Sequence, residues 1–137
     1  MGLLRGKTAL ITGGSRGIGE AIVLKYASEG ADVVFTYVSS EEKALAVKSA
    51  AEALGVRVLA IRSDAADYGQ AESLVNEVIS AFGKLDILIN NAGITRDTLM
   101  LRMSEEQWDE VIHTNLKSVF NLTKHALKPM MKQKAGS

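Results

Sequence analysis

The stretch of sequence that decides the fold covers residues 8–19 and reads Thr8-Ala9-Leu10-Ile11-Thr12-Gly13-Gly14-Ser15-Arg16-Gly17-Ile18-Gly19. It opens with a short, largely apolar run, which is typical of a strand buried on both faces of a sheet. A helical pattern follows over residues 17–29, where Ile18, Ile22 and Tyr26 recur at four-residue spacing. Gly30 stands at the usual stop position of a helix, so we expect this helix to end there. The glycine-rich loop is then expected to join a buried strand to a helix.

The glycines of this loop, Gly13, Gly17 and Gly19, suit the binding of a diphosphate. Glycine adopts positive φ easily and, lacking a Cβ, lets the backbone approach a ligand closely. The start of the following helix offers unpaired N–H groups and a partial positive charge. A strand before the loop and a helix after it form the context that a dinucleotide-binding loop requires. The loop therefore predicts dinucleotide binding, and a plain glycine-rich turn is the alternative.

The rest of the chain repeats the alternation of apolar runs and helical patterns. We expect further strands at residues 32–37, 56–62 and 85–89, with Ser39 or Ser40 and then Asp67 capping the helices between them. Strict alternation of strands and helices is typical of parallel sheets with helices on both faces. The pattern therefore predicts an α/β fold, a Rossmann-like doubly wound parallel sheet.

The last helix is expected to begin after Ser104, with Glu105 and Glu106 in its first turn. Pro129 is expected to kink or end it, because proline removes a backbone donor. Residues at helical spacing predict one buried stripe, which comprises Trp108, Val111, Ile112, Leu116, Val119, Leu122, Ala126 and Met130.

Composition narrows the class of protein. With 137 residues, 47% of them hydrophobic and 23% charged, the chain has the profile of a single globular domain over residues 1–137. A formal net charge of zero argues against a broad nucleic-acid-binding surface, and no apolar run approaches the roughly 18 residues of a membrane span. The absence of cysteine excludes a disulfide scaffold and fits a cytoplasmic location. His113 and His125 stand too far apart to form a metal pair, so we expect no metal site.

The residues around the loop bear on the choice of cofactor. An NAD-binding domain usually carries an acidic residue near the end of its second strand, where it binds the ribose 2′-hydroxyl. Here that segment reads Thr36-Tyr37-Val38-Ser39-Ser40, and the first carboxylate is Glu41. Together with Ser15 and Arg16 in the loop, this pattern favours the 2′-phosphate of NADP. A solvated arginine without a ligand is the alternative.

The sequence resembles the short-chain dehydrogenase/reductase family, and within it the 3-oxoacyl-[acyl-carrier-protein] reductases. The family resemblance is carried by the glycine loop at 12–19, Asp64, Asn115 and the run Asn90-Asn91-Ala92-Gly93. The closer resemblance to these reductases rests on residues 90–97, 99–103 and 114–120. The resemblance to the family as a whole covers essentially the whole chain. The resemblance implies a sheet with strand order 3-2-1-4.

The resemblance also implies cofactor-binding roles. The loop residues that match are Gly13, Ser15, Arg16, Gly17, Ile18 and Gly19. Asp64, with Ala65 beside it, matches the position that contacts the adenine; a capping or loop role is the alternative. The segment that matches the ribose and nicotinamide side, for which a tight turn is the alternative, comprises Asn91, Ala92 and Gly93.

Two further residues match functional positions of the family. Asn115 matches the catalytic asparagine, which helps to hold a water in a proton relay; its alternative is to satisfy nearby backbone. Lys134 matches a basic residue with which the 3-oxoacyl-[acyl-carrier-protein] reductases meet the acidic acyl carrier protein, whose thioester is their substrate. The alternative for Lys134 is simple stabilisation of a helix C-terminus by a cation.

The chain departs from the family pattern at its chemistry, which uses a Ser and a Tyr-x-x-x-Lys pair. Tyrosines occur only at Tyr26, Tyr37 and Tyr68, and none has a lysine four residues on. The resemblance therefore implies the NADPH-binding N-terminal part, truncated at its C-terminus, of a reductase that turns 3-oxoacyl into 3-hydroxyacyl thioesters. We expect this part to be inactive alone, because general acid catalysis needs a proton donor within hydrogen-bond reach.

Two alternatives remain open: a non-catalytic nucleotide-binding half-fold module, or part of another short-chain carbonyl reductase. In each case the fourth strand, at residues 85–89, would leave an apolar open edge, which invites pairing with another chain. We therefore expect homo-oligomers or self-association, through that edge or the last helix.

Overall fold

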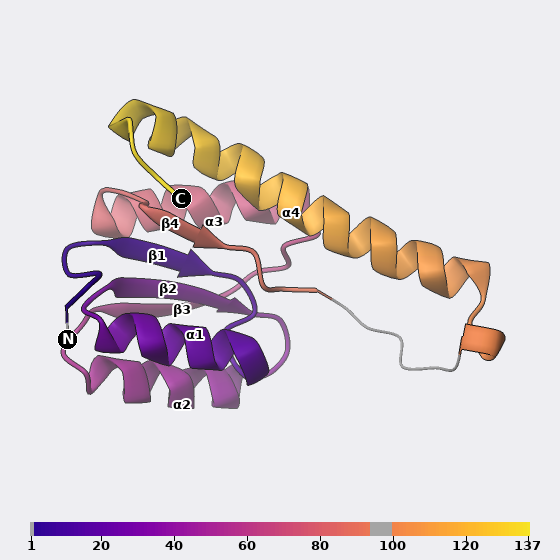
Figure 1. The fold of residues 1–137 in the computed structure, drawn as a ribbon, viewed down its shortest axis with the longest axis horizontal. Helices are drawn as coiled ribbons and strands as arrows, with labels where there is room; N and C mark the ends of the chain where they lie inside the picture. Colours follow the sequence, from indigo (N-terminus) through magenta and orange to yellow (C-terminus); the bar gives the residue numbers. More distant parts are fainter. Residues whose placement is uncertain (1, 94–99) are drawn as a thin grey trace.

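The computed structural model describes residues 2–93 and 100–137 (Figure 1). Its strands are β1 (Thr8–Ile11), β2 (Asp32–Tyr37), β3 (Val58–Arg62) and β4 (Ile87–Ile89). Its helices are α1 (Gly17–Ser28), α2 (Glu41–Glu52), α3 (Tyr68–Phe82), the short 3₁₀ turn η1 (Met100–Arg102) and α4 (Glu105–Gln133). In this part of the chain, no helix is both long enough and apolar enough to span a membrane.

The strands form one parallel sheet in the order β3-β2-β1-β4, which confirms the predicted fold class and strand order. Helices α1 and α2 cover one face of the sheet, and α3 and α4 cover the other (Figure 1). β1 lies between β2 and β4 and is buried at every position, because helices cover it on both sides. Its apolar run in the sequence has this physical origin.

Neighbouring strand residues point into two separate cores, because side chains alternate across a sheet. Leu10 and Val34 pack with the inner faces of α3 and α4. Ile11, Val33 and Phe35 pack with α1 and α2. All five side chains are completely buried, so the central strands anchor both layers.

The buried face of α1 is shifted by one residue from the four-residue repeat of Ile18, Ile22 and Tyr26 in the sequence. The helix buries Gly19, Val23 and Ala27, whereas Ile18 is 74% exposed. The cause is the loop before the helix. A Cβ placed on Gly19 would lie 1.9 Å from the carbonyl oxygen of Gly13, so this side of the helix packs against the loop backbone.

The other helix boundaries mostly follow the sequence, except that Ser40 begins α2 without the predicted side-chain cap. Asp67 caps α3 as predicted, since its Oδ1 accepts a hydrogen bond from the Gln70 N–H at 3.0 Å. Ser104 caps α4, where it forms a reciprocal capping box with Gln107. β3 and β4 each begin two residues later than predicted, at Val58 and Ile87.

The predicted buried stripe of α4 is wrong for its N-terminal half. Leu122 and Ala126 are buried, but Trp108 is 51% exposed and Leu116 is 65% exposed. The N-terminal half of α4 projects beyond the edge of the sheet at which the strands end (Figure 1), so no sheet lies beneath it. Periodicity shows that these apolar residues recur at helical spacing, but it could not show what they pack against.

Pro129 does not end α4, which excludes one of its two predicted effects. The helix continues through Pro129 to Gln133, where the Gln133 side chain holds the backbone of Leu85. Its Oε1 accepts from the Leu85 N–H at 3.0 Å, and its Nε2 donates to the Leu85 carbonyl at 2.8 Å. These bonds anchor the last turn of α4 to Leu85, two residues before β4 begins.

The exposed edge expected at β4 is partly covered by the end of the chain. Ser137 donates its N–H to the Asp86 carbonyl at 2.9 Å, and its own carbonyl accepts from the Leu88 N–H at 2.8 Å. The backbone therefore returns alongside β4 after α4 (Figure 1). The prediction of an open edge is corrected at this point, because one residue already occupies it.

Candidate dinucleotide-binding site

The loops after the four strands meet at the carboxyl edge of the sheet (Figure 1) and surround a groove of about 540 Å³. Ligands of open parallel sheets bind at this edge, where the strand order reverses. Here the reversal lies between β1 and β4. The groove brings together most of the predicted site residues: Gly13, Ser15, Arg16, Asp64, Ala65, Asn91, Ala92 and Gly93.

The start of α1 presents backbone N–H groups beside this groove. The first hydrogen bond within the helix runs from the Glu20 N–H to the Arg16 carbonyl at 3.2 Å, so the amides at positions 17–19 precede it. Arg16 stands at the N-cap and makes no side-chain capping bond, in contrast to the capped starts of α3 and α4. Three predicted residues, Gly17, Ile18 and Gly19, do not line the groove themselves; they place backbone N–H groups and the positive end of the helix dipole next to Arg16, which does.

The glycine spacing is required by close backbone contacts. Gly13 has a φ of 71°, and the Gly19 position leaves no room for a Cβ because of the Gly13 carbonyl. That carbonyl also accepts a hydrogen bond from Nδ2 of Asn91 at 3.0 Å. The loop after β1 is therefore locked to the segment after β4, as the tight-turn interpretation of Asn91 requires.

Two threonines with no role predicted from the sequence hold this arrangement together. Thr12 Oγ1 accepts hydrogen bonds from the N–H groups of Asn91 at 3.0 Å and Ala92 at 2.9 Å. Thr36 Oγ1 accepts from the Gly13 N–H at 3.1 Å. Both threonines are buried at strand ends. A hydroxyl placed where an apolar strand reaches its loop is the signal that could have identified them.

The loop after β3 carries Asp64 and Ala65. One Asp64 carboxylate oxygen accepts from the Ala66 N–H at 2.9 Å, and the Asp64 N–H donates to Gln70 Oε1 at 2.8 Å. Asp64 therefore shapes its own loop while its side chain stays exposed at the groove. Ala65 is buried, and its carbonyl accepts a hydrogen bond from Nδ2 of Asn121 on α4 at 3.0 Å.

The structure places Asn115 against the segment after β4. A Cβ on Gly93 would lie 2.9 Å from Oδ1 of Asn115, so the side chain from α4 touches a groove-lining residue. Asn115 itself does not line the groove. The rest of the matching run, residues 94–97 and Leu99, lies outside the described residues.

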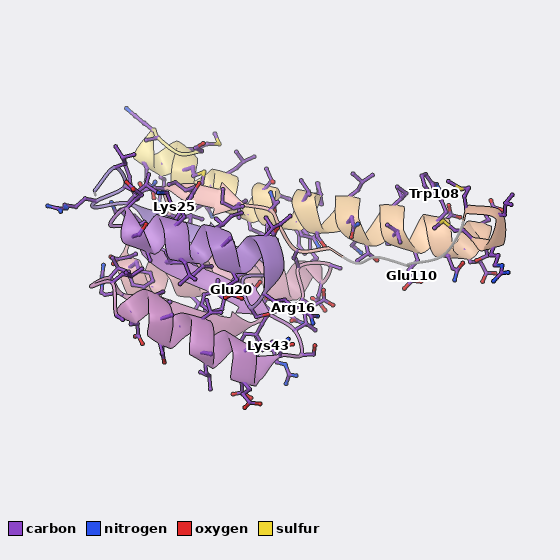
Figure 2. All side chains as sticks on the ribbon, turned by 60° about the horizontal axis from the view of Figure 1, so that its bottom comes forward. Arg16, Glu20, Lys25, Lys43, Trp108 and Glu110 are labelled. Carbon is purple, nitrogen blue, oxygen red and sulfur yellow. The ribbon has the colours of Figure 1, made fainter. Side chains whose placement is uncertain are left out.

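The charges around the groove are few. Arg16 is the one cation among its described lining residues, and the acids there are Asp64 and Glu110. Figure 2 shows Arg16 and Lys25 at opposite ends of α1. The end of β2 supplies hydroxyls, from Ser39 and Ser40, where a carboxylate would face a ribose 2′-hydroxyl. These residues fit a phosphorylated ribose, because a cation is present and a repelling carboxylate is absent from that segment.

A metal is not supported by the described residues. Across 2–93 and 100–137, no group of three or more His, Cys, Asp and Glu side chains is placed to hold a metal ion. What the groove offers a ligand is backbone donors, hydroxyls, the Arg16 guanidinium and the carboxylates of Asp64 and Glu110.

The chain matches known proteins along most of its length. A family model described as short chain dehydrogenase matches residues 7–137. The chain is 50% identical over 131 residues to the 3-oxoacyl-[acyl-carrier-protein] reductase FabG of Staphylococcus aureus (strain Mu50), covering 96% of this chain and 53% of that protein. It is 44% identical over 131 residues to FabG of Escherichia coli (strain K12), covering 96% of this chain and 52% of that one.

Solved structures agree with these matches. A short chain dehydrogenase from Burkholderia cenocepacia J2315 in complex with NADP superposes with a TM-score of 0.85 at 44% identity, over 92% of this chain and 51% of that one. A blue fluorescent protein from a metagenomic library, in complex with NADPH, gives 0.82 at 39% identity, over 91% and 51%. The chain thus spans about half the length of its relatives. Its fold, its glycine loop and the match over residues 7–137 place it in the short-chain dehydrogenase/reductase family.

Proposed function

We propose that the chain is the NADP-binding part of a 3-oxoacyl-[acyl-carrier-protein] reductase. The observation that carries the choice of NADP is Arg16 at the groove, opposite a β2 end that offers hydroxyls and no carboxylate. The names of the relatives support the reductase assignment, and NADP or NADPH in similar structures supports the cofactor. When bound, NADPH supplies the hydride.

The residues of the groove have distinct tasks in this proposal. The backbone amides at positions 17–19 hold the diphosphate, and the Arg16 guanidinium binds the 2′-phosphate. Asp64 and Ala65 receive the adenine end. The segment at 91–93, with Asn115 behind Gly93, faces the nicotinamide end.

In the whole reductase, the substrate is a 3-oxoacyl thioester carried by an acyl carrier protein. Reduction adds a hydride to the keto carbon and a proton to its oxygen, which gives a 3-hydroxyacyl thioester. The relatives' names support this substrate and partner. Lys134 ends α4 as an exposed cation, which suits contact with an acidic carrier protein.

The proposal is tested by replacing Arg16 with alanine. A charge-assisted hydrogen bond contributes about 1.5–3 kcal/mol, so Arg16→Ala should raise the Kd for NADPH by roughly ten- to a hundredfold. The Kd for NADH should change little, because NADH lacks the 2′-phosphate. Isothermal titration of both nucleotides measures the difference. An equal effect on NADPH and NADH would refute the assignment of Arg16.

Lys25→Ala provides a matched control on the same helix. Lys25 lies nine residues from Arg16, roughly 13 Å along the helix axis, and its side chain is 73% exposed. That separation exceeds the Debye length of about 8 Å at physiological salt, so removing this charge should leave both Kd values nearly unchanged.

We propose that the 137 residues bind nucleotide without turnover, because no tyrosine in them is followed four residues later by lysine. Absorbance of NADPH at saturating acetoacetyl thioester gives the rate directly. Steady NADPH oxidation by the pure chain would contradict this part of the proposal while leaving the binding site intact.

A further inference from the structure

Asn121 is a polar side chain in the core between α4 and the sheet. It is completely buried, and it is followed along α4 by the apolar core residues Leu122 and Ala126. Its Oδ1 has no hydrogen-bond partner among the described residues. A buried polar atom without a partner costs about 1–3 kcal/mol, so Asn121 is a poor choice for packing alone. Its distinguishing feature is the bond that its Nδ2 donates to the Ala65 carbonyl.

That bond holds the loop at the adenine end of the groove. Ala65 lies between Asp64 and Ala66, and all three residues line the groove. On the β2 side the loop is held by the Ser63 N–H, which donates to the Tyr37 carbonyl at 3.0 Å. On the α4 side it is held by Asn121, 56 residues away in the chain. The two bonds together fix the loop's backbone from opposite sides.

We propose that Asn121 is a positioning residue for the adenine end of the cofactor. By fixing the Ala65 carbonyl, it keeps Asp64 and Ala65 in the arrangement that forms this part of the groove before a ligand arrives. Without the bond, the ligand would have to order the loop on binding, and that ordering lowers affinity. This inference rests on the nucleotide site proposed above. It deepens that proposal, because Asn121 would preorganise the site without touching the ligand.

The decisive variant is Asn121→Leu, which keeps the number and branching of the side-chain heavy atoms and removes both the donor and the unpartnered Oδ1. We expect the Kd for adenosine 2′,5′-bisphosphate, measured by titration calorimetry with the 137-residue chain, to rise about five- to tenfold. Thermal unfolding should change little, because the cost of leaving the Ala65 carbonyl without its donor is offset by removal of the unpartnered Oδ1.

Leu122→Ala is the matched control, because it sits beside Asn121 and is equally buried. The cavity it creates should lower the Tm clearly, but the Kd for the bisphosphate should stay within about twofold. If both variants weaken binding in proportion to their loss of stability, Asn121 has only a structural role and the inference is overturned.

Hydrogen exchange supplies a readout that needs no ligand. In Asn121→Leu the amides at residues 63–67 should exchange faster than in the wild type, while the amides of β1 and β2 should not change. Unchanged exchange together with wild-type affinity overturns the inference and leaves the nucleotide site standing. A wild-type chain that does not bind the bisphosphate overturns both this inference and the proposed function.

Discussion

At the end of β1, one hydroxyl joins the two loops that form the centre of the site. Thr12 is 1% exposed, and its Oγ1 accepts from two backbone N–H groups in the segment after β4. The same oxygen lies 3.5 Å from the Ile89 carbonyl, to which it donates. A β-branched residue suits a strand end, but only a hydroxyl can also satisfy these two donors.

We therefore expect Thr12→Val to lower the free energy of unfolding by at least about 2 kcal/mol, because two N–H groups lose their acceptor. Thr12→Ser keeps the hydroxyl and removes one methyl, so its loss should stay near 1 kcal/mol. Urea denaturation of the three proteins measures both values. Equal stability of the Val and Ser variants would show that water replaces the lost acceptor.

At the scale of elements, the helix starts divide into capped and uncapped ones. Asp67 and Ser104 cap α3 and α4 with their side chains, while Arg16 and Ser40 make no such bond at α1 and α2. The two uncapped starts flank the groove, since Arg16 and Ser40 both line it. Helix starts that lack a side-chain cap keep their N–H groups for a ligand, which links the distribution of caps to the proposed function.

The capping box of α4 gives a prediction that is local to that helix. Ser104→Ala removes the bond that the Gln107 N–H donates to Ser104 Oγ at 3.1 Å, worth about 1 kcal/mol. Because the N-terminal half of α4 has little packing, this loss should appear as fraying of its first turn. We expect about fivefold faster hydrogen exchange at residues 107–110.

Ser40→Ala is the control, because Ser40 makes no capping bond and its replacement should leave exchange at the start of α2 unchanged. If the two serine variants behaved alike, the capping box would contribute nothing to α4.

At the scale of the whole molecule, the projecting half of α4 exposes a continuous apolar face. Its most exposed large residues include Trp108 at 51%, Leu116 at 65% and Phe120 at 57%. The charged residues of α4 are also separated by sign along the helix. Its acids are Glu105, Glu106, Asp109 and Glu110, and its lysines all follow them: Lys117, Lys124, Lys128 and Lys132. Two copies packed antiparallel through α4 would bury the apolar face and place acids opposite lysines.

We therefore expect the chain to self-associate through α4, and sedimentation equilibrium at micromolar concentrations should show dimers. The double variant Leu116→Glu and Phe120→Glu should shift the population to monomer, because it places four carboxylates in the apolar contact of a dimer. Leu45→Glu on α2, where Leu45 is 51% exposed, is the control and should leave the dimer unchanged. A monomeric wild type at high concentration would contradict this prediction.

Much of the fold was predictable because its causes are local. The apolar run of β1, the caps Asp67 and Ser104, and the glycine at position 19 each follow from the neighbouring chain. The same holds for the position of Arg16 beside the groove, which follows from a loop between a strand and a helix.

The remaining features depend on which segments meet in space. The roles of Thr12 and Asn121 arise from donors and acceptors more than fifty residues away, and no local pattern specifies those partners. The exposure of Trp108 and Leu116 follows from where the sheet ends beneath α4, and the covered β4 edge follows from the return of Ser137. Short-range chemistry set the elements, their order along the chain and the glycine loop. Burial and long-range hydrogen bonds, which exist only once the layers pack, decided which side chains support the site and which face solvent.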